Sequence, residues 1–147
     1  MKTVLLFFTS PLEVFQKVLD RYEKSGKQVL IVASARKKEV LLANCPGRNL
    51  LLFSTDFLDE SSIREVLNKV NLSSVSSVSF QMKAFNESDY WKLYSLMRKY
   101  FFRNKTEYFL FDQRCNLLAR RRVWVINAMF NYLKTTNIDL VFACFTA

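Results

Sequence analysis

The chain has no histidine, and this absence removes several kinds of chemistry. Its 147 residues include three cysteines, at positions 45, 115 and 144, and no Cys-x-x-Cys pair. A zinc site and a disulfide framework are therefore both disfavoured. The commonest general base, which is also the usual partner of a catalytic serine or cysteine, is missing. We predict no metal and no cofactor, and we interpret the cysteines as buried thiols of a protein in the reducing cytoplasm.

Glycine is almost as scarce, because Gly26 and Gly47 are the only two in the chain. The dinucleotide-binding motif G-x-G-x-x-G and the Walker loop both need glycines a few residues apart. Neither motif can be present, which argues against an ordinary dinucleotide enzyme or a P-loop ATPase. The segment 9–11, Thr-Ser-Pro, occupies the position of the phosphate loop in flavodoxin-like proteins but lacks the length of that loop.

Long hydrophobic runs are also missing, since none approaches the roughly 18 residues that a membrane span needs. We therefore expect no membrane segment. The apolar start, residues 1–8, is not followed by a cleavage site of small residues, so we do not interpret it as a signal peptide. Half of the residues are hydrophobic and 15% are aromatic, which is enough for a folded core. We predict a single α/β domain over residues 1–147.

Short apolar segments alternate with amphipathic segments along the chain. Such alternation favours parallel strands with helices on both faces of the sheet. We predict a three-layer (αβα), mainly parallel sheet of five to six strands, in a Rossmann-like or flavodoxin-like order. Residues 35–44 fit either a short helix or an extra strand. The predicted strands are 3–8, 29–33, 50–53, 75–82, 108–111 and 140–145, and the predicted helices are 11–24, 59–70, 88–101 and 121–134.

The predicted strand 75–82 differs from the others because polar residues occupy every second position. Ser77, Ser79 and Gln81 alternate with large apolar residues. Period-two alternation places these three side chains on one face of the sheet. That face is either exposed to water or covered by a helix that packs very close to it.

Candidate ligand-binding residues follow four of the predicted strands. In an open α/β sheet, ligands bind beyond the carboxyl ends of the strands, where helix N-termini favour anions. Hydroxyl, carboxylate and guanidinium groups at that edge suit a phosphorylated or sugar-like small molecule. An alternative for Ser10 is the N-cap of the first helix, and an alternative for Arg36 is a solvated basic loop. The candidates, in chain order, are Thr9, Ser10, Ser34, Arg36, Thr55, Asp56, Asp112 and Arg114.

The net charge of +9 favours an anionic partner, although a solvated basic surface explains it equally well. Arginines 120–122, together with Arg98 and Lys99, lie near aromatic residues, as in some nucleic-acid-binding surfaces. We do not favour nucleic acid, because those aromatic residues have the spacing of a helix core. The apolar segments 121–134 and 140–145 indicate either a central strand or a homodimer contact through the C-terminal helix and strand.

The segments 2–8 and 26–33 give the chain an architectural resemblance to a Rossmann-like half of glycosyltransferases of the GT-B type. That resemblance implies a nucleotide-sugar ligand in a cleft between two such domains. The chain has the length of one half and lacks the glycine-rich loops and the nucleotide-sugar signature of those enzymes. Three hypotheses follow: a module that binds a small ligand or nucleotide, a nucleic-acid-binding accessory protein, and a structural homodimer.

Overall fold

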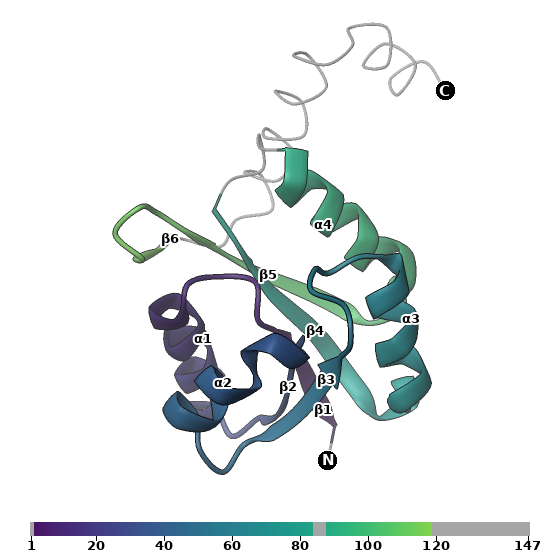
Figure 1. The fold of residues 1–147 in the computed structure, drawn as a ribbon, viewed down its shortest axis with the longest axis horizontal. Helices are drawn as coiled ribbons and strands as arrows, with labels where there is room; N and C mark the ends of the chain where they lie inside the picture. The colour runs from purple at the N-terminus through teal and green to yellow at the C-terminus, as the bar shows by residue number, and fades with distance from the viewer. Residues whose placement is uncertain (1, 84–87, 119–147) are drawn as a thin grey trace, which may run out of the picture.

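A six-stranded sheet in the order β3-β2-β1-β4-β5-β6 forms the centre of the computed structural model, which describes residues 2–83 and 88–118 (Figure 1). Strands β1 to β5 are parallel, and β6 pairs antiparallel with β5. The predicted α/β class is therefore confirmed, and the order of the parallel strands is the Rossmann-like one. The strands are β1 (Thr3–Phe7), β2 (Gln28–Ser34), β3 (Asn49–Phe53), β4 (Val75–Met82), β5 (Lys105–Phe111) and β6 (Leu117–Leu118).

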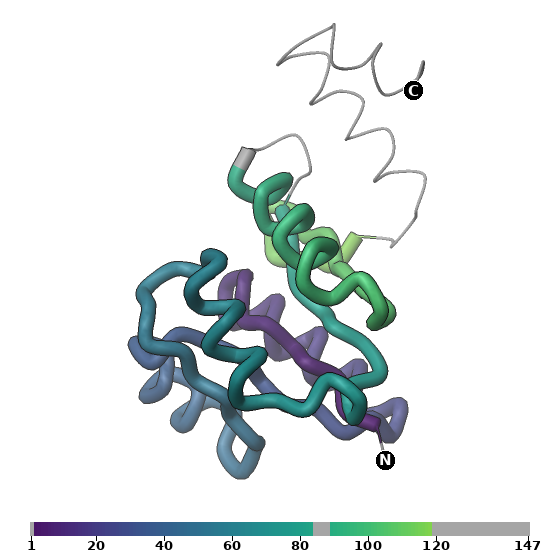
Figure 2. Tube along the Cα trace, turned by 90° about the vertical axis from the view of Figure 1, so that its right-hand side faces the viewer, coloured from purple at the N-terminus to yellow at the C-terminus, as the bar shows by residue number. Residues whose placement is uncertain are grey.

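Helices cover both faces of the sheet. α1 (Leu12–Lys24) and α2 (Lys38–Asn44) lie on one face, and α3 (Glu60–Lys69) and α4 (Ser88–Tyr100) lie on the other. Figure 2 shows α3 and α4 in front of the strands. Two short 3₁₀ helices, η1 (Ala35–Lys37) and η2 (Leu72–Ser74), join neighbouring elements. Within the described residues, no helix is both long enough and apolar enough to cross a bilayer.

The central strand β1 supplies side chains to two separate cores. Val4 and Leu6 pack with the helices on the α1 side, whereas Leu5 and Phe7 pack with α3 and α4. These residues are at most 1% exposed. A strand that is buried on both faces needs a continuous apolar run, which is why residues 3–8 were recognisable as a strand.

Two helix ends follow local rules, whereas the starts of α1 and α2 have no side-chain cap. Gly26 has φ of +76° just beyond α1, a conformation that favours glycine. Asp59 caps α3, because its side chain accepts a hydrogen bond from Ser62 N at 2.9 Å. The predicted role of Ser10 as N-cap of α1 is wrong. The N-cap is Pro11, and no side chain caps this helix.

The ambiguous residues 35–44 form η1 and α2 and not an extra strand. Strand β6 was not predicted, since a two-residue strand has no sequence period. It belongs to a hairpin whose turn contains Cys115 with φ of 61°. The predicted helix 121–134, the predicted strand 140–145, arginines 120–122 and the proposed homodimer contact all lie outside the described residues.

The polar face of β4 is buried, so the predicted alternative of a water-exposed face is wrong. Ser77, Ser79 and Gln81 are 5%, 0% and 0% exposed. They lie on the α1 side of the sheet, because the alternate residues Val78 and Phe80 belong to the core on the side of α3 and α4. The hydroxyl oxygen of Ser79 is buried and has no hydrogen-bond partner among the described residues.

Replacing Ser79 with alanine should stabilise the protein. An unpaired buried hydroxyl loses its hydration without a compensating hydrogen bond, so Ser79→Ala should raise the free energy of unfolding by about 1 kcal/mol. Urea denaturation measures this change. Ser77→Ala, on the same face of β4, should stay within about 0.5 kcal/mol of the parent. A clear loss of stability in Ser79→Ala would mean that its hydroxyl is hydrogen-bonded in the folded protein.

Candidate functional site

The chain leaves the adjacent strands β1 and β4 in opposite directions. β1 is paired with β2 on one side and with β4 on the other. From β1 the chain continues into α1 on one face of the sheet, whereas α4 follows β4 on the other face (Figure 1). This arrangement is a topological switch point, which is where ligands bind in open α/β sheets.

Gln81, near the end of β4, holds the loop that follows β1. Its side chain is fully buried and donates a hydrogen bond from Nε2 to the carbonyl oxygen of Phe7 at 3.0 Å. Its Oε1 accepts hydrogen bonds from Thr9 N at 3.3 Å and from Ser10 Oγ at 2.9 Å. The hydroxyl of Thr9 accepts from Gln81 N at 2.9 Å and donates to Gln81 O at 2.8 Å. Both predicted ligand hydroxyls are therefore used to fix the shape of the loop.

This loop presents the start of α1 at the switch point. Phe15 N donates to Pro11 O at 3.1 Å, which is the first hydrogen bond of the helix. The three preceding N–H groups, those of residues 12–14, receive no side-chain cap. Uncapped N–H groups and the positive end of the helix dipole together attract an anion. The carboxylate of Glu13 lies in the same first turn and opposes a second negative charge.

Four other predicted residues form a second group beyond β2 and β3. Ser34 Oγ donates to Thr55 O at 2.7 Å, which ties the ends of these two strands together. Arg36 and Asp56 form an ion pair at 3.4 Å, with side chains 68% and 54% exposed. Such an exposed pair contributes little to stability, so its guanidinium group is available to a stronger anionic partner.

Glu65 of α3 was not predicted, and it fixes the loop after β3. Its Oε2 accepts hydrogen bonds from Ser54 N at 3.0 Å and from Ser54 Oγ at 2.9 Å. These bonds stabilise the carboxylate and hold the pKa of Glu65 below its usual value. The hydrogen bonds to Glu65 therefore fix the start of the loop that carries Thr55 and Asp56.

Asp112 and Arg114 form the third group, in the turn between β5 and β6. Asp112 Oδ1 accepts hydrogen bonds from Arg114 N and Asn116 N, both at 2.9 Å. The bond from Asn116 is the main cause of a lowered pKa at Asp112. An aspartate that bonds to the backbone two residues further on forms an Asx turn, which explains its position directly after a strand.

The eight predicted residues therefore lie in three groups along the carboxyl edge. Asp56 follows β3 and Asp112 follows β5, and four strand spacings separate these strands, or about 19 Å. Only the first two groups follow the neighbouring strands β1, β2 and β3. In the described part of the chain, no three His, Cys, Asp or Glu side chains are grouped so as to hold a metal.

Gln81 is the principal residue that sequence reasoning missed. Its signal was an amide side chain on the small-residue face of a buried strand, close to the carboxyl end. A search of protein-family models and of curated proteins finds no match to the chain. The geometry at the switch point is therefore the basis for a functional assignment.

Removing the Gln81 side-chain amide should destabilise the protein strongly. Gln81→Leu retains most of the volume but leaves Thr9 N, Ser10 Oγ and Phe7 O without these partners. We expect the free energy of unfolding to fall by about 2–4 kcal/mol. A suitable control is Ser76→Ala, which removes another hydrogen bond from a β4 side chain to β1, at 3.4 Å. That control should change stability by less than about 0.5 kcal/mol, and equal effects of the two variants would contradict this role of Gln81.

The turn at Asp112 should make stability depend on pH. Its pKa is lowered by folding, so its carboxylate stabilises the fold above the unfolded pKa of about 3.9. That contribution is lost as the pH falls through the lower, folded pKa. Asp112→Asn keeps an oxygen acceptor but does not titrate. The stability difference between parent and variant, measured by urea denaturation from about pH 6 to about pH 2, should therefore shrink toward zero in acid.

Asp112→Ala is the control for that experiment, because alanine offers no acceptor to the backbone at any pH. It should be less stable than Asp112→Asn across the whole range. A parent-to-asparagine difference that does not change with pH would show that the turn does not depend on the carboxylate charge.

Proposed function

We propose that the protein binds a phosphorylated small molecule, of the nucleotide or nucleotide-sugar class, at the carboxyl edge of the sheet where β1 and β4 diverge. The uncapped start of α1, held at this switch point by Gln81, is the observation that carries the proposal. The Rossmann-like strand order supports it, since this crevice is the usual ligand position in such sheets.

A phosphate group would accept hydrogen bonds from the free N–H groups of residues 12–14. Because Gln81 already fixes the loop, binding costs little additional ordering of the chain. The dipole of α1, which is 13 residues long, and the net charge of +9 both favour a negative ligand. The first turn of α1 therefore has the role of the primary phosphate contact.

The rest of the ligand would extend from β1 toward the neighbouring strand β2. Arg36 follows β2 and has an exposed ion pair with Asp56 that a phosphate can replace. A guanidinium group can bind a phosphate through two parallel hydrogen bonds. The architectural resemblance to a half of GT-B glycosyltransferases agrees with a nucleotide-sugar ligand in this direction.

A thermal-shift panel tests this proposal directly. Nucleoside mono- and diphosphates, nucleotide sugars and sugar phosphates should raise the melting temperature, because a ligand that binds only the folded state stabilises it. The corresponding nucleosides and free sugars, which lack phosphate, should have no effect. If no compound of the panel raises the melting temperature, and a polynucleotide column retains the chain in a salt-dependent way, the basic surface is the functional feature instead.

A charge variant in α1 locates the binding site. Glu13→Gln removes a carboxylate from the first turn and should tighten binding of a phosphorylated ligand about two- to fivefold. Asp20→Asn makes the same change in net charge on an exposed residue further along α1, and it should leave the affinity unchanged. Isothermal titration calorimetry compares the two. Equal tightening in both variants would indicate only a general effect of net charge and would contradict a site at the helix start.

A further inference from the structure

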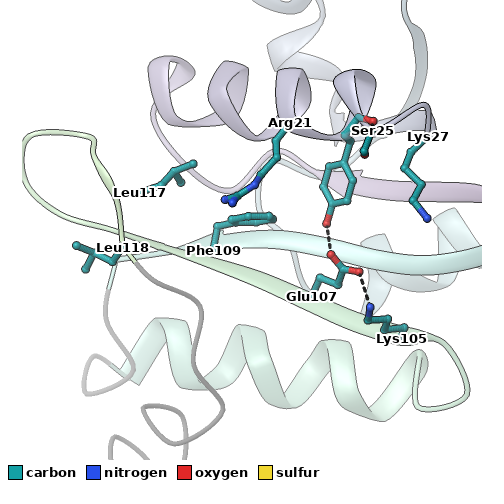
Figure 3. Close-up of a pocket in the computed structure, with 9 residues that line it drawn as sticks. Arg21, Ser25, Lys27, Lys105, Glu107, Phe109, Leu117 and Leu118 are labelled. Carbon is teal, nitrogen blue, oxygen red and sulfur yellow. Dashed lines mark hydrogen bonds and ion pairs between the residues drawn. The ribbon is translucent and has the colours of Figure 1, made fainter.

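A groove of about 700 Å³ lies between α1 and the β5–β6 hairpin, on the opposite face of the sheet from α3 and α4 (Figure 3). Its volume is typical of a small-molecule site. None of the eight residues predicted from the sequence lines it. The groove is also separate from the switch point, because it reaches the amino end of β5 at Lys105 and the amino side of β2 at Lys27.

The two ends of the groove differ in chemistry. Leu117 and Leu118, both half-buried, form an apolar end next to the ring of Phe109. Lys27 and Lys105 lie at the other end, on opposite walls (Figure 3). A ligand that has an apolar body and a charged group at one end would match both ends of the groove.

The cations of the groove outnumber its carboxylates. Glu107 accepts a hydrogen bond from Tyr22 Oη at 2.8 Å and pairs with Lys105 Nζ at 3.4 Å, with a side chain only 14% exposed. Glu107 is therefore the partner of Lys105, and among the described residues it is the only acidic one that lines the groove.

The other two cations have no such partner. The guanidinium group of Arg21 lies over the ring of Phe109, 5.7 Å from its centroid. Neither Arg21 nor Lys27 forms an ion pair with any carboxylate of residues 2–83 and 88–118. Two positive charges thus remain unmatched beside an apolar wall, which favours an anion.

We propose that this groove binds an amphipathic organic anion. The apolar or aromatic body of the ligand contacts Phe109 and the two leucines, while its phosphate or carboxylate group lies near Lys27 and Lys105. Arg21 covers the middle of the ligand, where its planar group can stack on an aromatic ring. This site does not depend on the proposed function at the carboxyl edge.

The probe for this proposal is 2-naphthyl phosphate, titrated into the full-length chain by calorimetry. It should bind at least about tenfold more tightly than inorganic phosphate, which lacks the apolar body, or 2-naphthol, which lacks the charge. Amide NMR shifts locate the probe. Binding in the groove should move the signals of Glu107, Phe109 and Leu117, whereas binding at the switch point would move those of residues 12–14.

Lysine variants complete the test. Lys27→Gln should weaken probe binding about five- to tenfold, because one charge-assisted contact is lost. Lys24→Gln is the matched control: it removes an exposed lysine at the end of α1, three residues before Lys27, that does not line the groove, and it should leave the affinity unchanged. Glu13→Gln should also leave groove binding unchanged, which separates this proposal from the carboxyl-edge site. Equal affinities in Lys27→Gln and Lys24→Gln, or no groove shifts at millimolar probe, would overturn the proposal.

Discussion

The structure depends on the pairing of β1 with β4, which a buried glutamine extends beyond the end of the strand. Gln81 is bonded through both its side chain and its backbone to the loop after β1. The hydroxyl of Thr9 takes part in this pairing in place of a backbone group. A loop with that many buried or partly buried hydrogen bonds has one low-energy shape, because each buried group left unpaired costs stability. The direction in which α1 leaves the sheet is therefore set by a residue that lies 72 positions from Thr9 and 71 from Ser10 in the sequence.

The α1 side of the sheet combines a buried centre with an open groove. Ser77 and Ser79 of β4 are buried on this side, at 5% and 0% exposed. Helix α1 also contacts β5, where Tyr22 meets Phe109 edge to face at 6.0 Å. Lys105, Glu107 and Phe109 of β5 line the groove. The groove therefore lies beside the contact of Tyr22 with Phe109, both of which line it.

Much of the fold could be predicted because its signals are local. Continuous apolar runs identify the buried strands, and the predicted helix 11–24 corresponds to α1, whose Phe15, Val18 and Leu19 are buried. The cap prediction at Ser10 was wrong because its partner is distant in sequence. The eight residues at the carboxyl edge were predicted from their position after the strands alone, and their division into three groups was not predicted. The Asx turn at Asp112 is local, since its partners are two and four residues further on. The groove could not be predicted from the sequence, because the segments that line it are far apart in the chain and no periodic pattern relates them.

Helix α1 is the one element that both proposed sites share. Its 13 residues span about 20 Å, with the start at the switch point and the end beside the groove. Two bound anions at that separation are more than twice the Debye length of about 8 Å apart, so their direct repulsion is largely screened. Coupling between ligand binding at the two sites would therefore require α1 to move. Gln81 holds the loop before the helix, and Lys17 Nζ donates to Cys115 O of the hairpin turn at 3.1 Å, which opposes such a movement. The two sites are accordingly expected to bind their ligands independently.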